Sequence, residues 1–164
     1  WGDLDFLVID LPPGTGDIQL SLSQNLPLAG AVIVSTPQEV ALIDVRRAIN
    51  MFKKVNVKIL GIIENMSYFQ NDVNQEKIFL FGKEGAKNEA SKQKIKFLGD
   101  IPILEEISRS SDAGKPIAVL DSSPISKKFE SISSKLCEAV KENKVDQPTI
   151  EIIEDWFIIL NQIF

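Results

Sequence analysis

The sequence contains no histidine and only one cysteine, Cys137. With one cysteine the chain cannot form an internal disulfide, and without histidine it cannot build a His/Cys metal cluster. A Cys–His pair and a Ser–His–Asp triad are excluded for the same reason. The composition therefore rules out His/Cys metal sites and the common histidine-dependent nucleophilic enzymes within this chain.

Basic residues are also few, with 18 Lys and Arg against 23 Asp and Glu, a net charge of −5. Because charges of both signs are mixed along the chain, we expect no basic face for a nucleic acid. No apolar run reaches the roughly 20 residues of a membrane-spanning helix, and no signal peptide opens the chain. We therefore predict a cytoplasmic protein that binds neither nucleic acid nor membrane.

The length of 164 residues suits one domain with a substantial core. The chain opens on Trp1 rather than methionine, and strand-forming residues follow at once, so we expect the native protein to begin further upstream. We expect the domain to cover residues 1–143. Residues 144–164 form an apolar but acidic tail, which is either a packing or interface segment or a non-native extension.

The chain is organised around residues 4–17, which read LDFLVIDLPPGTGD. The apolar run at 6–9 is bounded by turn signals and predicts a strand buried on both faces of a parallel sheet. Asp10 stands where that strand leaves the core. Taken alone, Asp10 is most simply a turn residue that closes the strand.

The loop after Asp10 is more specific than a turn requires. Pro12 and Pro13 fix the backbone, and Gly14 and Gly16 let another group approach closely. An apolar strand, a terminal Asp and a Pro-Gly loop are typical of the second phosphate-site motif in P-loop NTPases. In that motif the Asp bears on the magnesium ion and a glycine amide faces the γ-phosphate. We therefore interpret the loop as part of a nucleotide site.

Strands and helices alternate along the rest of the chain. Apolar runs predict further strands at 31–34, 58–63 and 96–101. Capping residues and helical spacing predict helices at 17–26, 37–52, 103–112 and 124–140, with at best a solvated helix within 83–93. This alternation predicts a doubly wound α/β fold with a mainly parallel sheet and helices on both faces.

In such a fold, ligands bind beyond the carboxyl ends of the strands. Four polar stretches stand at those ends, namely 10–17, Ser35–Thr36, Glu64–Asn65 and 100–102. We therefore predict that they share one rim and form a binding site. Thr36 also opens a capping box with Glu39, so a capping role and a ligand role stay open for Ser35 and Thr36. Asn65 is likewise either a turn residue or a ligand contact.

Three motifs carry a resemblance to a known family: DLPPGTGD at 10–17, PLAGAVIVSTPQEVALIDVRRAINMF at 27–52 and VKILGIIENMSYF at 57–69. In this order they resemble the Mrp (ApbC) family of iron–sulfur carrier ATPases, in the MinD/ParA-like branch of P-loop NTPases. The resemblance runs from about Leu4 to Leu120. It implies a homodimer that binds and hydrolyses ATP, takes part in iron–sulfur cluster assembly and delivers clusters to apo-protein acceptors.

The resemblance also implies roles for individual residues. Asp10 would hold Mg²⁺ through water and act in hydrolysis together with Gly14. The stretch Pro12–Gly14 would line bound ATP, Asn65 would hydrogen-bond the adenine ring, and the backbone near Pro102 would lie against that ring. ATP, Mg²⁺ and an iron–sulfur cluster are thus the implied cofactors.

The chain departs from the family in two respects. It contains no G-x-x-x-x-G-K-[ST] loop, which in the family follows a strand next to the one carrying Asp10. We therefore expect the complete protein to be an Mg-dependent ATPase and this chain alone to be inactive, with a central strand missing and sheet edges exposed. Residues 70–75 read QNDVNQ where the family places a Cys-x-x-Cys pair, so no residue is expected to ligate a cluster. Cys137 lies on a predicted helix and reads as a buried apolar residue.

Two other functions stay open. A partition or positioning ATPase of the ParA/MinD kind would bind DNA or a membrane, and the acidic composition counts against it. A non-catalytic interaction module is suggested by the absent phosphate loop and the absent cysteine pair.

Because a cluster of this family needs two cysteines per subunit, we predict that this chain retains no iron–sulfur cluster by itself. After anaerobic reconstitution, iron and sulfide should be lost on desalting, as followed by iron and sulfide analysis and by visible absorbance. Cys137→Ala should behave like the unaltered chain. Stoichiometric retention that disappears in Cys137→Ala would contradict the prediction.

Overall fold

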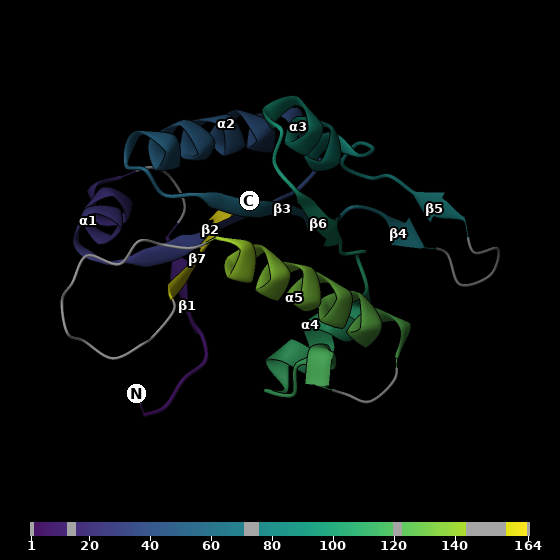
Figure 1. The fold of residues 1–164 in the computed structure, drawn as a ribbon. Coiled ribbons are helices and arrows are strands. Elements are labelled where there is room, and N and C mark those ends of the chain that lie inside the picture. Colours follow the sequence, from purple (N-terminus) through teal and green to yellow (C-terminus); the bar gives the residue numbers. More distant parts are fainter. Residues whose placement is uncertain (1, 13–15, 71–75, 120–122, 144–156, 164) are drawn as a thin grey trace.

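The computed structural model describes residues 2–12, 16–70, 76–119, 123–143 and 157–163 of the chain. Within them, a five-stranded sheet carries helices on both faces (Figure 1). The strand order is β1–β7–β2–β3–β6, and every neighbouring pair is parallel. The predicted doubly wound α/β fold is confirmed.

The strands of this sheet are β1 (Leu7–Leu11), β2 (Leu28–Ser35), β3 (Ile59–Glu64), β6 (Phe97–Asp100) and β7 (Phe157–Ile163). A separate antiparallel pair consists of β4 (Phe69–Gln70) and β5 (Lys77–Ile78). The helices are α1 (Asp17–Asn25), α2 (Glu39–Lys54), α3 (Gly85–Gln93), α4 (Glu105–Asp112), α5 (Pro124–Glu142) and a 3₁₀ turn at Ile117–Val119.

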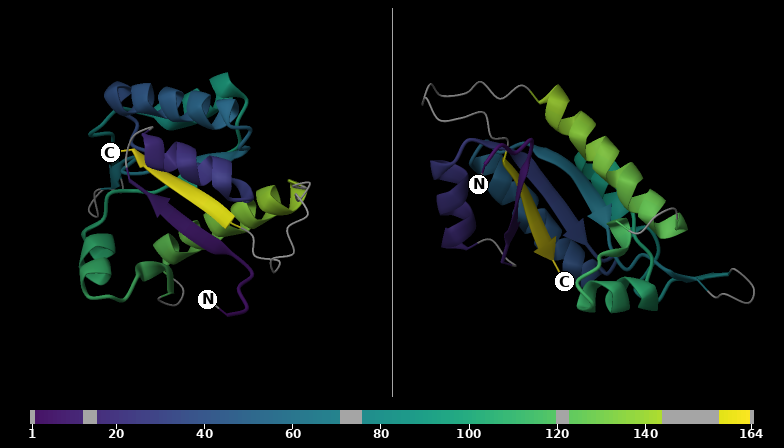
Figure 2. Two further views of the ribbon diagram at one scale, coloured as in Figure 1. Left: turned by 90° about the vertical axis from the view of Figure 1, so that its left-hand side faces the viewer. Right: turned by 90° about the horizontal axis from the view of Figure 1, so that it is seen from below.

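The sheet has a hydrophobic core on each face. On one face lie α1, α2 and α3, and the fully buried α2 side chains Val45, Ile49 and Phe52 belong to that core. On the other face lies α5, which packs Ile132 and Val140 against β2, β3 and β6 (Figure 2). Strands covered on both faces are apolar along their whole length, which is why β2 and β3 read as continuous runs. Among the described residues, no helix is both long and apolar enough to cross a membrane.

An irregularity at Gly30 decides which β2 side chains face each core. The pairing register of β2 with β7 shifts between Leu28 and Gly30, so one extra residue is inserted there. As a result Leu28 and Ala31 face the same core although they are three residues apart. Gly30 has a φ of +156°, and a Cβ at this position would lie 2.5 Å from Cγ of Leu60. Only glycine fits this bulge.

Helix boundaries agree with the sequence where capping is local. Ser123 caps α5 by accepting a hydrogen bond from the Ser126 N–H at 3.1 Å, as its Ser-Pro start predicts. The predicted capping box at Thr36 is wrong, because α2 begins at Glu39 and its N-cap residue, Gln38, makes no side-chain capping bond. The prediction of a solvated helix at 83–93 is also wrong, since Ala86, Glu89 and Ala90 of α3 are buried.

The sequence predicts no strand after residue 143. That expectation is wrong, because β7 lies between β1 and β2 and pairs in parallel with both. Residue Leu160, for example, is opposite Asp10 on one side and opposite Val32 on the other. The strands β1 and β2 are consecutive in the chain yet do not pair, and β7 closes the space of one strand between them.

We predict that β7 is required for the stability of the sheet, and Ile159→Pro tests this. Proline removes a backbone donor from the pairing with β1 or β2 and is not tolerated in a central strand. The free energy of unfolding in urea should fall by more than about 2 kcal/mol. Ile159→Val keeps the backbone N–H and should cost about 1 kcal/mol or less. If both variants unfolded like the unaltered chain, β7 would not be part of the folded sheet.

Candidate functional site

The loops that follow β2, β3 and β6 lie side by side at the carboxyl end of the sheet. Ser35 pairs with Glu64, and Glu64 pairs with Asp100, so the next residues of the three strands stand at the same level. The N–H of Asn65 donates to the carbonyl of Ser35 at 2.8 Å, and the N–H of Ile101 donates to the carbonyl of Glu64 at 2.8 Å. The predicted sharing of one rim by these three strand ends therefore holds.

Asn65 and Pro102 are neighbours on this rim. The half-buried Asn65 accepts a hydrogen bond from the N–H of Met66 at 3.0 Å through Oδ1. Met66 has a φ of 51°, and Ser67 donates its N–H to the carbonyl of Ile101 at 2.9 Å. Asn65 thus acts as a turn residue, while its side-chain NH₂ group is not used in that contact. Pro102 follows directly on Ile101 and is buried.

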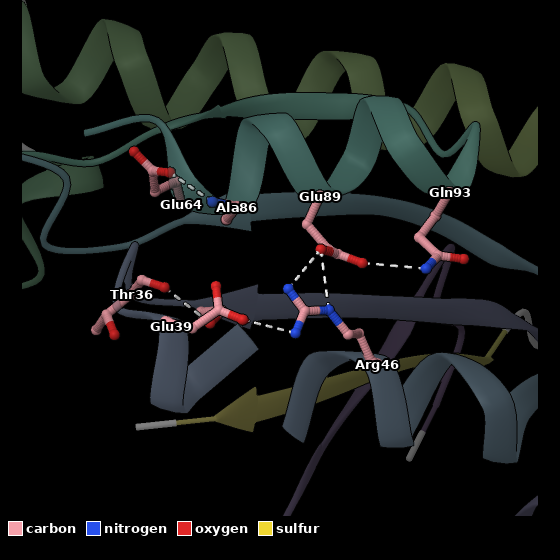
Figure 3. Close-up of polar contacts among 8 residues, drawn as sticks. Thr36, Glu39, Arg46, Glu64, Ala86, Glu89 and Gln93 are labelled. Carbon is pink, nitrogen blue, oxygen red and sulfur yellow. Dashed lines mark hydrogen bonds and ion pairs between the residues drawn. The ribbon is translucent and has the colours of Figure 1, made fainter. Parts of the chain in front are cut away.

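The buried carboxylate of Glu64 holds this part of the rim in place through two hydrogen bonds. Its side chain is 1% exposed. One oxygen accepts the N–H of Ala86 at 2.8 Å, in the first turn of α3 (Figure 3), and the other accepts the Ser67 hydroxyl. A helix N-terminus favours a carboxylate because its N–H groups are unpaired and its dipole is positive there. Glu64 therefore fixes the turn at 65–67 to the start of α3.

The start of α3 also lies in close contact with the loop after β2. A Cβ on Gly85 would lie 2.1 Å from the carbonyl oxygen of Pro37. Because that neighbour is backbone, only glycine allows this approach. The loop that carries Thr36 and Pro37 is thus held between β2 and α3.

An ion-pair network joins α2 to α3 on the outside of this contact (Figure 3). Arg46 donates from Nε and Nη2 to one oxygen of Glu89 at 3.1 and 3.0 Å, and from Nη1 to Glu39 at 2.7 Å. Gln93 donates to the second oxygen of Glu89 at 3.0 Å. Burial acts to raise the pKa of the Glu89 carboxyl group, but the hydrogen bonds from Arg46 and Gln93 outweigh burial and hold the pKa below 4.5.

Asp100, at the end of β6, forms an ion pair with a lysine of α5. Lys128 donates to its carboxylate at 2.7 Å. Burial acts to lower the pKa of the Lys128 ammonium group, but the hydrogen bond and the charge of Asp100 raise it overall. Asp100 therefore serves to fix α5 to the rim.

Asp10 stands apart from Asn65 and Pro102. It is exposed near the end of β1. Asp10 and Val32 both pair with Leu160 of β7, so they stand at the same height along the strands. Two strand spacings separate β1 from β2, about 10 Å, and Thr36 lies four residues beyond Val32, about 13 Å along the strand. A ligand that touches both ends of this rim has to be extended.

The loop after Asp10 is described only in part. The carbonyl of Pro12 accepts a hydrogen bond from Nε2 of Gln19 at 2.7 Å, and Gln19 is 2% exposed. This bond fixes the start of the loop to α1. Pro13 and Gly14, which the resemblance places at the nucleotide, lie outside the described residues.

Magnesium prefers about six oxygen ligands and usually keeps several waters and substrate phosphates among them. The described residues contain no group of three or more His, Cys, Asp or Glu side chains that could hold a metal. The single carboxylate of Asp10 therefore fits an ion that arrives with nucleotide phosphates, and does not by itself form a metal site.

From the sequence, Thr36 has either a capping role or a ligand role, and the structure excludes the capping role. Thr36 is 7% exposed, and its Oγ1 has no hydrogen-bond partner within the described part of the chain. Its hydroxyl therefore does not cap α2. Sequence patterns cannot report an unpaired buried oxygen, because burial and pairing depend on residues far apart in the chain.

Comparisons with known proteins agree with this geometry. A family model described as "ParA: NUBPL iron-transfer P-loop NTPase" matches residues 1–137. The chain is 56% identical over 142 residues to an iron–sulfur cluster transfer protein NUBPL of Dictyostelium discoideum, covering 86% of this chain and 44% of that protein. It is 49% identical over 147 residues to an iron–sulfur cluster carrier protein of Aquifex aeolicus, covering 89% of this chain and 40% of that protein.

A solved structure is similar as well. It is described as a nucleotide-binding protein in complex with ADP from Archaeoglobus fulgidus, and it aligns with a TM-score of 0.66 at 44% identity, covering 79% of this chain and 51% of that chain. The chain spans half or less of the length of the curated relatives named above. The residues of the rim fall inside the family match, whereas β7 falls outside it.

We predict that Glu89 stabilises the α2–α3 contact much more than Glu39 does, although Arg46 bonds both. Glu89→Gln removes the negative charge paired with the guanidinium and leaves the amide NH₂ facing a donor of Arg46 or Gln93 in a buried position, so the free energy of unfolding should fall by about 1–3 kcal/mol. Glu39 is 70% exposed, so Glu39→Gln should have a far smaller effect.

The pH dependence of the stabilisation by Glu89 provides a control for this prediction. Because the pKa of Glu89 is lowered in the folded state, its contribution is present above pH 4.5 and is lost as the pH falls through the lowered value. The stability difference between the unaltered chain and Glu89→Gln, measured by urea unfolding, should therefore shrink under acidic conditions. An equal effect of both substitutions at neutral pH would contradict the assignment.

Proposed function

The chain belongs to the family of NUBPL iron-transfer P-loop NTPases, and from this premise we propose that it forms the magnesium side and the base side of an ATP site in an iron–sulfur cluster carrier. The observation that supports this proposal is the placement of Asp10 and of the Asn65–Pro102 pair on one rim of the sheet, at the carboxyl ends of parallel strands. The ADP complex of the similar solved structure supports it independently.

In this proposal each end of the rim binds a different part of the nucleotide. The side-chain NH₂ of Asn65 and the backbone at Pro102 bind the adenine ring, and the hydrogen bonds of the 64–67 turn keep these groups in place. Asp10, with Gly14 and the two prolines before it, faces the phosphates and orients the attacking water. Bound Mg²⁺ would neutralise phosphate charge, and Asp10 would hold it through water.

The phosphate cradle is not encoded in these 164 residues, since no G-x-x-x-x-G-K-[ST] sequence occurs in them. Backbone amides and a lysine of such a loop supply most of the binding to the β- and γ-phosphates. ATP hydrolysis therefore needs a loop from outside these residues, and this chain alone should be inactive.

The iron–sulfur cluster is the cargo in this proposal. The one cysteine, Cys137, is half-buried on α5, and residues 71–75, where the relevant loop falls, lie outside the described residues. Cluster ligands would have to come from a second protein or from another segment. A homodimer, delivery to apo-protein acceptors and a cytoplasmic location stay predictions.

A non-catalytic interaction module is the second candidate function. The position of β7 favours it, because β7 takes the place between β1 and β2 that a strand leading into a phosphate loop would otherwise fill. A chain of this kind would bind partners through its surface and would not turn over ATP. The proposed ATPase and this alternative differ in the role of Asp10.

We predict that Asp10→Asn, in the protein at its full natural length, abolishes Mg-dependent ATP hydrolysis with little loss of stability. The carboxylate is exposed at a strand end, so its charge serves the ligand rather than folding. Turnover would be measured by phosphate release and stability by thermal unfolding.

Asp5→Asn is the matched control, because Asp5 is an exposed carboxylate two residues before the start of the same strand. It should leave turnover unchanged. Normal turnover in Asp10→Asn would remove Asp10 from the site, and absence of turnover in the unaltered full-length protein would favour the interaction module.

A further inference from the structure

Within the described part of the chain, the hydroxyl of Thr36 is a buried polar group without a hydrogen-bond partner. The residue is 7% exposed, and Oγ1 forms no hydrogen bond within the described part of the chain. The hydroxyl next to it in the sequence is satisfied, since Ser35 Oγ donates to the carbonyl of Thr36 at 3.0 Å. Most buried side-chain oxygens in folded proteins are hydrogen-bonded, so an exception needs an explanation.

The backbone on both sides of this hydroxyl is held in place by contacts with β3 and α3. The backbone before it is held by the bond from the Asn65 N–H to the Ser35 carbonyl. The backbone after it is held against α3, where a Cβ on Gly85 would meet the Pro37 carbonyl at 2.1 Å. Contacts on both sides therefore hold the Thr36 backbone in a position where its hydroxyl has no partner among the described residues.

The position of Thr36 indicates what its partner is. Because Ser35 and Glu64 are paired, Thr36 stands level with Asn65 on the neighbouring strand. It lies far from Asp10, by about 10 Å across the sheet and about 13 Å along it. The hydroxyl therefore belongs to the end of the rim that carries Asn65, away from the carboxylate that faces phosphate.

We propose that the Thr36 hydroxyl hydrogen-bonds the nucleoside part of the bound nucleotide, next to Asn65. This inference rests on the proposed nucleotide site. A hydroxyl can donate one hydrogen bond and accept up to two, so it can pair with a ring nitrogen, an exocyclic amine or a ribose hydroxyl. The ligand then supplies the partner that the folded chain does not.

Two substitutions separate this role from a structural one. Thr36→Val keeps the branched shape and removes the hydroxyl, whereas Thr36→Ser keeps the hydroxyl. In the protein at its full natural length, titration calorimetry should show ADP and ATP binding to Thr36→Val about threefold to tenfold more weakly than to the unaltered protein. The loss should be equal for both nucleotides, because the contact does not involve the γ-phosphate. Thr36→Ser should bind both nearly as the unaltered protein does.

Thermal unfolding without nucleotide is the second measurement. Removing an unpaired buried hydroxyl does not break a protein hydrogen bond, so Thr36→Val should unfold at the same temperature or a higher one. Unchanged affinity in Thr36→Val would overturn the inference, and so would a lowered unfolding temperature or a loss confined to ATP. If the unaltered protein bound neither nucleotide, the proposed function itself would fail, and this inference with it. A protein that binds both nucleotides while Thr36→Val is unaffected would leave the proposed function standing.

Discussion

The parallel pairing of β7 with both β1 and β2 is the constraint on which the sheet depends. The chain segment from β1 through α1 to β2 leaves a space of one strand between its two strands, and only a strand from elsewhere can satisfy the backbone groups on both sides. Once β7 lies there, the position of Asp10 relative to Thr36 and Asn65 is determined by strand spacing and register. The distance between the two ends of the rim is therefore a property of the sheet.

Within that sheet, the buried carboxylate of Glu64 organises the base side of the rim. It joins the end of β3 to the first turn of α3 and to the Ser67 hydroxyl, and the turn at Asn65 lies between these contacts. The Arg46–Glu89 pair holds α3 from its other side. Because α3 also confines the loop at Pro37, the free chain already holds Asn65 and Thr36 in place. Such preorganisation reduces the ordering that a bound nucleotide would otherwise require.

Features that depend on short stretches of sequence could be predicted, and those that depend on distant residues could not. The apolar runs of β2 and β3 and the Ser-Pro start of α5 are local signals, and each predicts an element that the structure contains, although β2 begins at Leu28, before the predicted residue 31. The buried face of α3 depends on Arg46, which lies 43 residues before Glu89, and no pattern within α3 indicates it. The run FIIL in β7 suits a strand or a buried helix equally, and only its fit between β1 and β2 decides. The unpaired hydroxyl of Thr36 has no sequence signal of any kind.

The position of β7 also limits how a phosphate cradle could join this site. The resemblance places the strand that leads into the phosphate loop next to the strand carrying Asp10, and β7 takes the inner position beside that strand. One position in a sheet holds one strand, so β7 and a phosphate-loop strand cannot both lie between β1 and β2. Residues 157–163 contain no glycine or lysine, so β7 itself supplies neither the tight turn nor the cation of such a loop. In the described sheet, a strand leading into a phosphate loop can therefore pair with the outer edge of β1, and it can take the inner position only if β7 leaves it.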